Sequence, residues 1–179
     1  NEEVCQIPKM FPEHDTYNRV ICIAGIGSKK TFSALMTDCI PEVQLMMNAQ
    51  CFPLYWYECQ DGGLFSSGIE RLDGVSDEAL KIFRSKYSDG SITKEDIFYY
   101  IYGVLSSYEY AESFGDDVKK VLARVPFARD FRVFSEAGRK LGDLHVNYET
   151  LPPWDVKITE RFPEHRVSAE FYHADRMRI

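Results

Sequence analysis

A run of glycines and lysines, residues 25–30, comes directly after the first apolar stretch of the chain and reads Gly-Ile-Gly-Ser-Lys-Lys. A phosphate-binding P-loop requires a later glycine followed by Lys and Ser or Thr, and a dinucleotide loop requires a third glycine that opens a helix. Neither pattern is present, because the residues from Phe32 onward indicate a strand. The run predicts a turn with solvated lysines. The alternative is a loop in which Ser28, Lys29 and Lys30 contact nucleic-acid phosphates.

A second set of candidate residues lies between positions 121 and 145, where five bases stand against three acids. Residues 89–120 hold seven acids and only three lysines. Four of the five bases are arginine, whose guanidinium makes forked contacts with phosphate or guanine. A solvated helix face is the alternative interpretation. The five candidates are Arg124, Arg129, Arg132, Arg139 and Lys140.

His145 and the five cysteines could also take part in chemistry, but their surroundings in the sequence favour structural roles. His145 has Asp143 nearby but no nucleophile candidate beside it, and we interpret it as a helix-end residue whose charge suits the helix dipole. The five cysteines are an odd number without Cys-x-x-Cys spacing, which indicates reduced thiols rather than zinc ligands or disulfides. We therefore expect neither catalytic residues nor a metal site.

The overall charge argues against a self-sufficient nucleic-acid binder. Asp and Glu number 28 against 21 Lys and Arg, a net charge of −7, whereas phosphate contacts require clustered bases. No apolar run approaches the ~20 residues of a transmembrane helix, and no signal segment is evident. We expect a cytoplasmic protein without membrane contact. The chain starts at Asn1 and stops straight after a strand-like stretch, so we also expect a piece cut from a longer protein.

Apolar, β-branched and aromatic runs predict strands in the first part of the chain. They cover residues 19–24, 32–36, 43–47 and 51–57. Glycine and serine then predict a flexible linker over residues 61–75. A further strand is expected around residues 168–173.

Helix signals follow the linker. Ser76 can cap one helix, and Thr93 with Asp96 forms a capping box before the amphipathic residues 97–105. A shorter helix is expected over residues 116–122. A last helix, capped by Asp130, is expected to turn one face inward: Phe131, Phe134, Leu141, Leu144 and His145. The fold class is therefore α+β, with a small β-rich part followed by a helical lobe.

Two stretches go beyond generic pattern. One consists of RVICIAGIGSKKTFSALMTD at residues 19–38, Ile-Pro at 40–41 and QCFPLYWYE at 50–58. The other consists of ITKEDIFYYIYGVL at 92–105, FSEAGRKL at 134–141, Leu-His at 144–145 and Asn-Tyr-Glu at 147–149. Together they resemble the C-terminal, target-recognition region of type ISP restriction-modification enzymes, whose relatives are known as DNA helicases or adenine-N6 DNA methyltransferases.

The resemblance implies a domain order of nuclease, helicase, coupler, methyltransferase and target-recognition domain. Residues 1–60 would then be the last strands of a methyltransferase-like sheet, residues 76–151 the helical part of the recognition domain, and residues 152–179 its truncated extension. The Asn-Pro-Pro-Tyr and S-adenosylmethionine loops of the family would lie upstream. The resemblance thus implies no cofactor in this chain, while S-adenosylmethionine, ATP and Mg²⁺ would serve the parent enzyme.

The sequence therefore leaves two possible functions for the chain. In the first, the chain is a specificity module through which the parent enzyme binds double-stranded DNA. In the second, it is a scaffold that docks the recognition domain onto the upstream methyltransferase and helicase domains without touching DNA. A scaffold predicts an exposed apolar patch, whereas a specificity module predicts salt-sensitive duplex binding.

Overall fold

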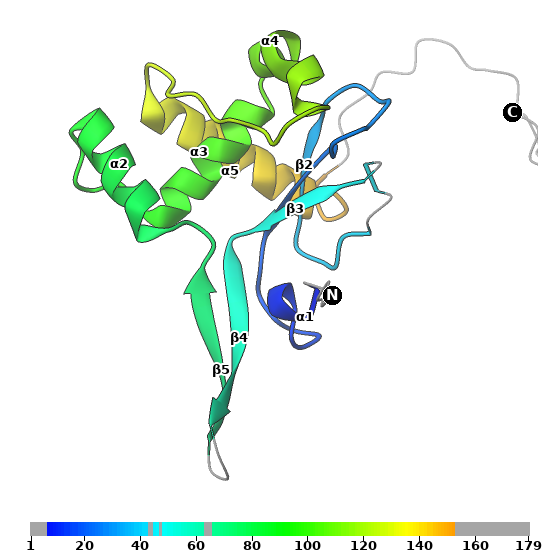
Figure 1. Ribbon diagram of the computed structural model, residues 1–179, viewed down its shortest axis with the longest axis vertical. Coiled ribbons are helices and arrows are strands. Elements are labelled where there is room, and N and C mark those ends of the chain that lie inside the picture. Colours follow the sequence, from blue (N-terminus) through cyan, green and yellow to red (C-terminus); the bar gives the residue numbers. More distant parts are fainter. Residues whose placement is uncertain (1–6, 43–44, 47, 63–65, 153–179) are drawn as a thin grey trace, which may run out of the picture.

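Three short strands form an antiparallel sheet with β1 in the middle (Figure 1): β1 Val20–Ile23, β2 Ala34–Thr37 and β3 Gln50–Pro53. The computed structural model describes residues 7–42, 45–46, 48–62 and 66–152. All four residues of β1 are buried. Successive side chains point to opposite faces of a strand, so Ile21 and Ile23 join the main core while Val20 and Cys22 join a smaller cluster around Met10.

A long β-hairpin projects from this sheet as an arm (Figure 1) and consists of β4 (Tyr55–Gly62) and β5 (Ser66–Asp73). Residues 61–62 and 66–73 lie in these strands. The expectation of a flexible linker over 61–75 is therefore wrong for these residues. Tyr57 pairs with Arg71 across the hairpin, and the Arg71 guanidinium lies 4.3 Å from the ring centre of Tyr55. These cross-strand contacts order a segment whose composition indicates flexibility. The proposed division into domains stays a prediction.

Five helices accompany the strands: α1 Ile7–Met10, α2 Asp77–Tyr87, α3 Lys94–Leu105, α4 Tyr108–Val118 and α5 Phe131–Val146. The predicted caps are confirmed. Side-chain oxygens of Ser76, Thr93 and Asp130 each accept a hydrogen bond from the backbone amide three residues on, in the first turns of α2, α3 and α5. The capping box of α3 is complete, since the Asp96 carboxylate accepts from the Thr93 amide at 3.0 Å. The α+β class is confirmed.

Two local expectations from the sequence are wrong, and a third lies outside the described residues. The helix expected over 116–122 instead begins at Tyr108 and ends at Val118, because Ser107 caps it. Of the strand expected over 43–47, the described residues 45–46 form a turn. The strand expected around 168–173 lies outside the described residues.

Helices α3 and α5 cross at two glycines. A Cβ on Gly103 would lie 2.3 Å from the Phe134 carbonyl oxygen, and one on Gly138 would lie 2.0 Å from that of Tyr99. Only glycine permits this approach of two backbones. The α5 surface buried against its neighbours includes Phe131, Ser135, Gly138 and Gly142. The predicted inner face was therefore partly wrong, and Leu144 is half exposed.

Candidate nucleic-acid interface

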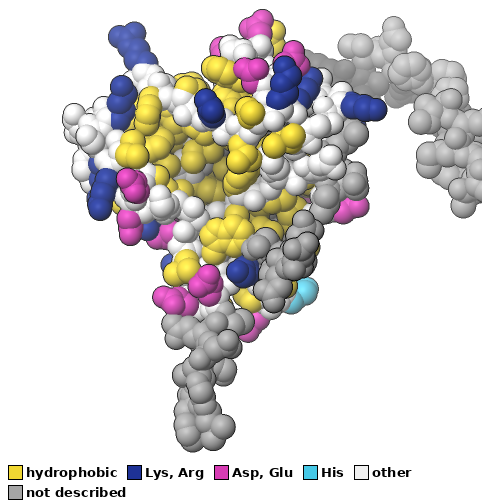
Figure 2. All heavy atoms as spheres, viewed as in Figure 1, with side chains coloured by type: hydrophobic (Ala, Val, Ile, Leu, Met, Phe, Trp, Pro, Cys, Tyr) yellow, Lys and Arg dark blue, Asp and Glu magenta, His cyan; other side chains and the backbone are white. Residues whose placement is uncertain are grey.

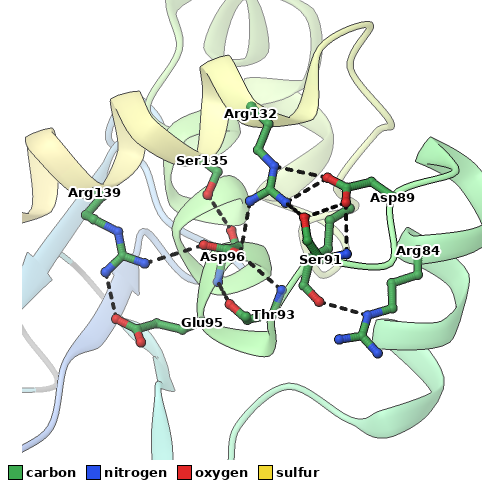
Figure 3. A network of polar contacts seen from close by, with 10 residues as sticks. Arg84, Asp89, Ser91, Thr93, Glu95, Asp96, Arg132, Ser135 and Arg139 are labelled. Carbon is green, nitrogen blue, oxygen red and sulfur yellow. Dashed lines mark hydrogen bonds and ion pairs between the residues drawn. The ribbon is translucent and has the colours of Figure 1, made fainter.

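Two of the predicted bases, Arg132 and Arg139, lie between α5 and the start of α3 (Figure 3). Arg132 donates to Asp89 Oδ2 from Nε at 3.1 Å and from Nη2 at 2.7 Å, and to Asp96 Oδ2 from Nη1 at 3.2 Å. Arg139 donates to Glu95 Oε1 at 2.7 Å. Both guanidinium groups are thus already paired with carboxylates of their own chain.

The acids of this network outnumber its arginines. Asp89, Glu95 and Asp96 face two guanidinium groups, so the local charge does not favour a phosphate. Hydrogen bonds from Ser91, then from Arg132, lower the pKa of Asp89 to about 2. The arrangement fastens α5 to the start of α3 and to the turn before it, which is a structural role for both arginines.

Arg124 and Arg129 lie instead on an irregular loop, residues 119–130, which runs from α4 to α5. Both side chains are exposed. Among the ion pairs of the described residues, none involves either of them. Their guanidinium groups are therefore available to an anionic partner.

Three tyrosine hydroxyls hold this loop by its backbone. Tyr110 of α4 donates to the carbonyl of Arg124 at 3.0 Å, and Tyr87 of α2 donates to that of Ala128 at 2.8 Å. Tyr100 of α3 donates to the Pro126 carbonyl at 2.7 Å and accepts from the Ala128 amide at 2.6 Å. Burial raises the pKa of Tyr87 and Tyr110, so both hydroxyls keep their protons at neutral pH. We call residues 119–130 the tyrosine-anchored loop.

An aromatic contact secures the same loop. The Phe127 ring packs edge-on against Phe83 at a centroid distance of 5.2 Å, a geometry that aromatic pairs prefer. The loop lacks regular structure but is tied to α2, α3 and α4. Arg124 and Arg129 are therefore presented from a fixed backbone, which lowers the entropy cost of binding.

The turn at residues 25–30 keeps two of its three candidates at the surface. Lys29 and Lys30 are exposed, while Ser28 is buried and its Oγ accepts from the Lys30 amide at 3.2 Å. Gly27 has a φ of +81° and donates its amide to the Lys119 carbonyl at 2.8 Å. Ser28 shapes the turn, and the two lysines remain free to meet an anion.

Lys140, the last candidate, is exposed on α5 and takes part in no ion pair of the described residues. It is one position from Arg139, which is a rotation of ~100° around a helix. The bases between 121 and 145 therefore form no single cluster. Arg132 and Arg139 on α5 are paired with carboxylates, Arg124 and Arg129 lie on the loop outside any ion pair of the described residues, and Lys140 stands apart from both.

His145 lies in the last turn of α5 and has a structural role, as predicted, but the predicted positive charge at the helix end is wrong. Its Nδ1 is hydrogen-bonded to the hydroxyl of Tyr102, and burial lowers the pKa of the imidazole. Burial also raises the pKa of Tyr102 to about 12. The imidazole borders a pocket of about 500 Å³ with largely apolar walls that include Met36 and Ile40. A neutral ring bonded to a buried phenol is a packing partner.

Sequence reasoning missed the anchoring tyrosines and the lysines at the end of α4. Tyr100 falls within the amphipathic residues 97–105, a pattern that predicts only a core ring. Only the positions of the tyrosine hydroxyls reveal the bonds to the loop. Lys119 and Lys120 were placed within a helix, and no signal linked them to the distant turn at 25–30.

Neither a metal centre nor a membrane-spanning helix is found in the part of the chain that the structure describes. No group of three or more His, Cys, Asp or Glu side chains in these residues could hold a metal ion. No helix among them is long and apolar enough to cross a membrane.

Comparisons with known proteins give a family match and several similar solved structures. A family model described as the type ISP C-terminal specificity domain matches residues 2–179, and runs across the expected boundary at 61–75 without a break. A comparison with curated proteins gives no match.

Three solved structures are similar. The first is the DrdV–DNA complex, with 35% identity over 91% of this chain and 15% of that one, at a TM-score of 0.77. The second is LlaBIII, an ATP-dependent type ISP restriction-modification enzyme bound to DNA, with 30% identity over 82% of this chain and 9% of that one, at 0.70. The third is a nuclease-deletion mutant of the type ISP enzyme LlaGI in complex with a DNA substrate mimic, with 33% identity over 87% and 12%, at 0.67.

Proposed function

Because the chain belongs to the family of type ISP C-terminal specificity domains, we propose that it recognises the DNA target of a restriction-modification enzyme. The observation that carries the proposal is the family match over residues 2–179. The three similar structures are described as complexes with DNA or a DNA substrate mimic, which supports the same partner for this chain.

The chain spans only 9% to 15% of the solved chains that it resembles. Nuclease, helicase and methyltransferase activities are therefore assigned to upstream domains of a parent protein. S-adenosylmethionine, ATP and Mg²⁺ would serve those domains. The described residues offer no metal-binding cluster of their own. The parent enzyme would act in the cytoplasm, where its DNA substrate lies.

Free cations favour one part of the surface for DNA. The exposed candidates that take part in no ion pair among the described residues are Lys29, Lys30, Arg124, Arg129 and Lys140. Arg132 and Arg139 each contact two carboxylates, and each would have to leave both before it could bind a phosphate. We therefore assign the DNA contacts to the free bases and assign fold stability to Arg132 and Arg139.

A docking role is a second candidate, and one observation favours it. Large apolar side chains are exposed on α4 and on the tyrosine-anchored loop, and Figure 2 shows hydrophobic side chains spread over the face that carries these elements. The most exposed are Tyr108, Phe114, Val121, Leu122 and Phe127. Such a patch is typical of a protein interface. The upstream methyltransferase domain of the same polypeptide is the proposed partner. Phe114, Val121 and Leu122 line the same hollow as Lys120 and Arg124, so docking at this patch would compete with DNA contacts there.

Duplex binding by the chain tests the proposal. Fluorescence anisotropy with a mixed-sequence duplex should give weak, salt-sensitive binding, because phosphate contacts release counterions. The double variant Arg124→Gln/Arg129→Gln should weaken binding and lower the salt slope by about 0.9 per lost contact. The control Lys81→Gln changes an exposed lysine on α2 and should leave the affinity and the salt slope unchanged. Binding that is absent, or insensitive to salt, would contradict a DNA contact.

Sequence preference separates target recognition from non-specific attachment. Duplexes selected from a random pool by repeated binding to the chain should converge on a motif, since base contacts carry the specificity. A pool that stays random after selection would contradict target recognition and leave only backbone binding.

A further inference from the structure

The turn at residues 25–30 and the C-terminal end of α4 are joined although about ninety residues separate them. The Gly27 amide donates to the Lys119 carbonyl at 2.8 Å, and the Ser28 amide closes the turn on Gly25 at 3.1 Å. The φ of +81° at Gly27 is a left-handed conformation that favours glycine. This bond places Lys29 and Lys30 beside the lysines that end α4.

The joined segments carry several bases on one surface. Lys120 and Arg124 line the same hollow, with a volume of about 320 Å³. Lys119 lies 2.8 Å from Asp116 across an ion pair in which the Asp116 side chain is 89% exposed. An exposed pair of this kind contributes little energy, so Lys119 can exchange its carboxylate for a phosphate.

We propose that these bases form one binding surface for the sugar-phosphate backbone of duplex DNA, which adds Lys119 and Lys120 to the contacts of the proposed function and rests on it. We call this surface the basic ridge: Lys29, Lys30, Lys119, Lys120 and Arg124. Its five bases stand against three nearby acids of α4, which are Glu112, Asp116 and Asp117. In Figure 2, Lys and Arg side chains lie beside Asp and Glu side chains where Figure 1 places α4, and a further basic side chain lies where it places the β1–β2 loop.

The composition of the basic ridge fits a backbone partner rather than a base-specific one. Four of its members are lysines, which act as flexible point charges and suit phosphates, whereas the planar fork of arginine is better suited to paired contacts with guanine. Lysines at the end of α4 also suit the negative pole of that helix. The ridge would hold the duplex in register while other residues read the bases.

The decisive experiment is lysine footprinting on the unmodified chain. Acetylation of each lysine is measured by mass spectrometry with and without a mixed-sequence duplex at saturating concentration. DNA should reduce acetylation at Lys29, Lys30, Lys119 and Lys120 together and leave Lys81 unchanged. Bound DNA without protection of Lys119 and Lys120 overturns the ridge and leaves the proposed function intact. A chain that binds no duplex overturns the proposed function and the ridge with it.

Salt dependence gives an independent measure of the same surface. The double variant Lys29→Gln/Lys120→Gln joins one base from each segment, and both side chains are exposed, so the fold should persist. The slope of log affinity against log salt should fall by about 1.8, since each phosphate contact contributes about 0.9. A slope equal to that of Lys81→Gln overturns the proposal.

Discussion

The hydroxyl of Tyr100 donates a hydrogen bond to the carbonyl oxygen of Pro126 at 2.7 Å. It thereby connects the middle of α3 to a loop without regular structure. The same oxygen accepts from the Ala128 amide at 2.6 Å, so one side chain satisfies two backbone groups of the tyrosine-anchored loop. A loop without regular backbone structure is in this way fixed by the helical core.

Removal of this hydroxyl should loosen the loop. In Tyr100→Phe, two backbone groups lose their partner, and the free energy of unfolding should fall by about 1–3 kcal/mol. Tyr108→Phe, at a side chain that is 74% exposed, is the matched control and should be neutral. Urea unfolding followed by circular dichroism measures both. Equal stabilities of the two variants would show that the hydroxyl does not hold the loop.

Acid should weaken the Arg132 network. The folded pKa of Asp89 is about 2, below the ordinary value of 3.8. A depressed pKa stabilises the fold above the unfolded value, and this contribution is lost as the pH falls from 3.8 towards 2. Asp89→Asn should be less stable than wild type at pH 7 and lose less stability on acidification. Urea midpoints at pH 7 and pH 3 test this, and parallel losses in both proteins would refute it.

The α3–α5 crossing should tolerate no side chain at Gly138. A Cβ there would lie 2.0 Å from a backbone oxygen, so Gly138→Ala forces the helices apart. Overpacking of this kind costs about 1–3 kcal/mol or more. Gly90→Ala is the matched control, because a Cβ added at Gly90 would have no other atom within 4 Å. In thermal unfolding, Gly138→Ala should have a lower Tm than Gly90→Ala. A Gly138→Ala protein as stable as the control would contradict the close crossing.

Arg132 and Arg129 should respond in opposite ways to substitution by Gln. Arg132→Gln breaks ion pairs with Asp89 and Asp96 and should reduce stability by about 1 kcal/mol. Its effect on duplex affinity should be small. Arg129→Gln should leave stability unchanged and weaken duplex binding. Urea unfolding and anisotropy on the two proteins decide the assignment, and a reversed pattern would return Arg132 to the DNA interface.

Much of the fold was predictable because its signals are local. Ser76, Thr93 and Asp130 each cap a helix by bonding to an amide within three residues, so spacing along the chain suffices to find them. β1 was predictable from its unbroken apolar run. The start of β4 lies within the strand expected over residues 51–57, but the rest of the arm formed by β4 and β5 was not predicted, because cross-strand pairing orders its glycines and serines. Similarly, Gly103 and Gly138 resemble ordinary helix residues until the two helices meet.

By itself, the sequence determined the α+β class, the helix starts, the family resemblance and the set of basic residues from which an interface could be built. It could not determine which of those bases are free. Arg132 and Arg139 lie opposite carboxylates, and Asp89, Glu95 and Asp96 reach that position through tertiary packing. Only the tertiary structure decided which basic side chains are available to a partner, because an ion pair depends on distance in space and not on separation along the chain.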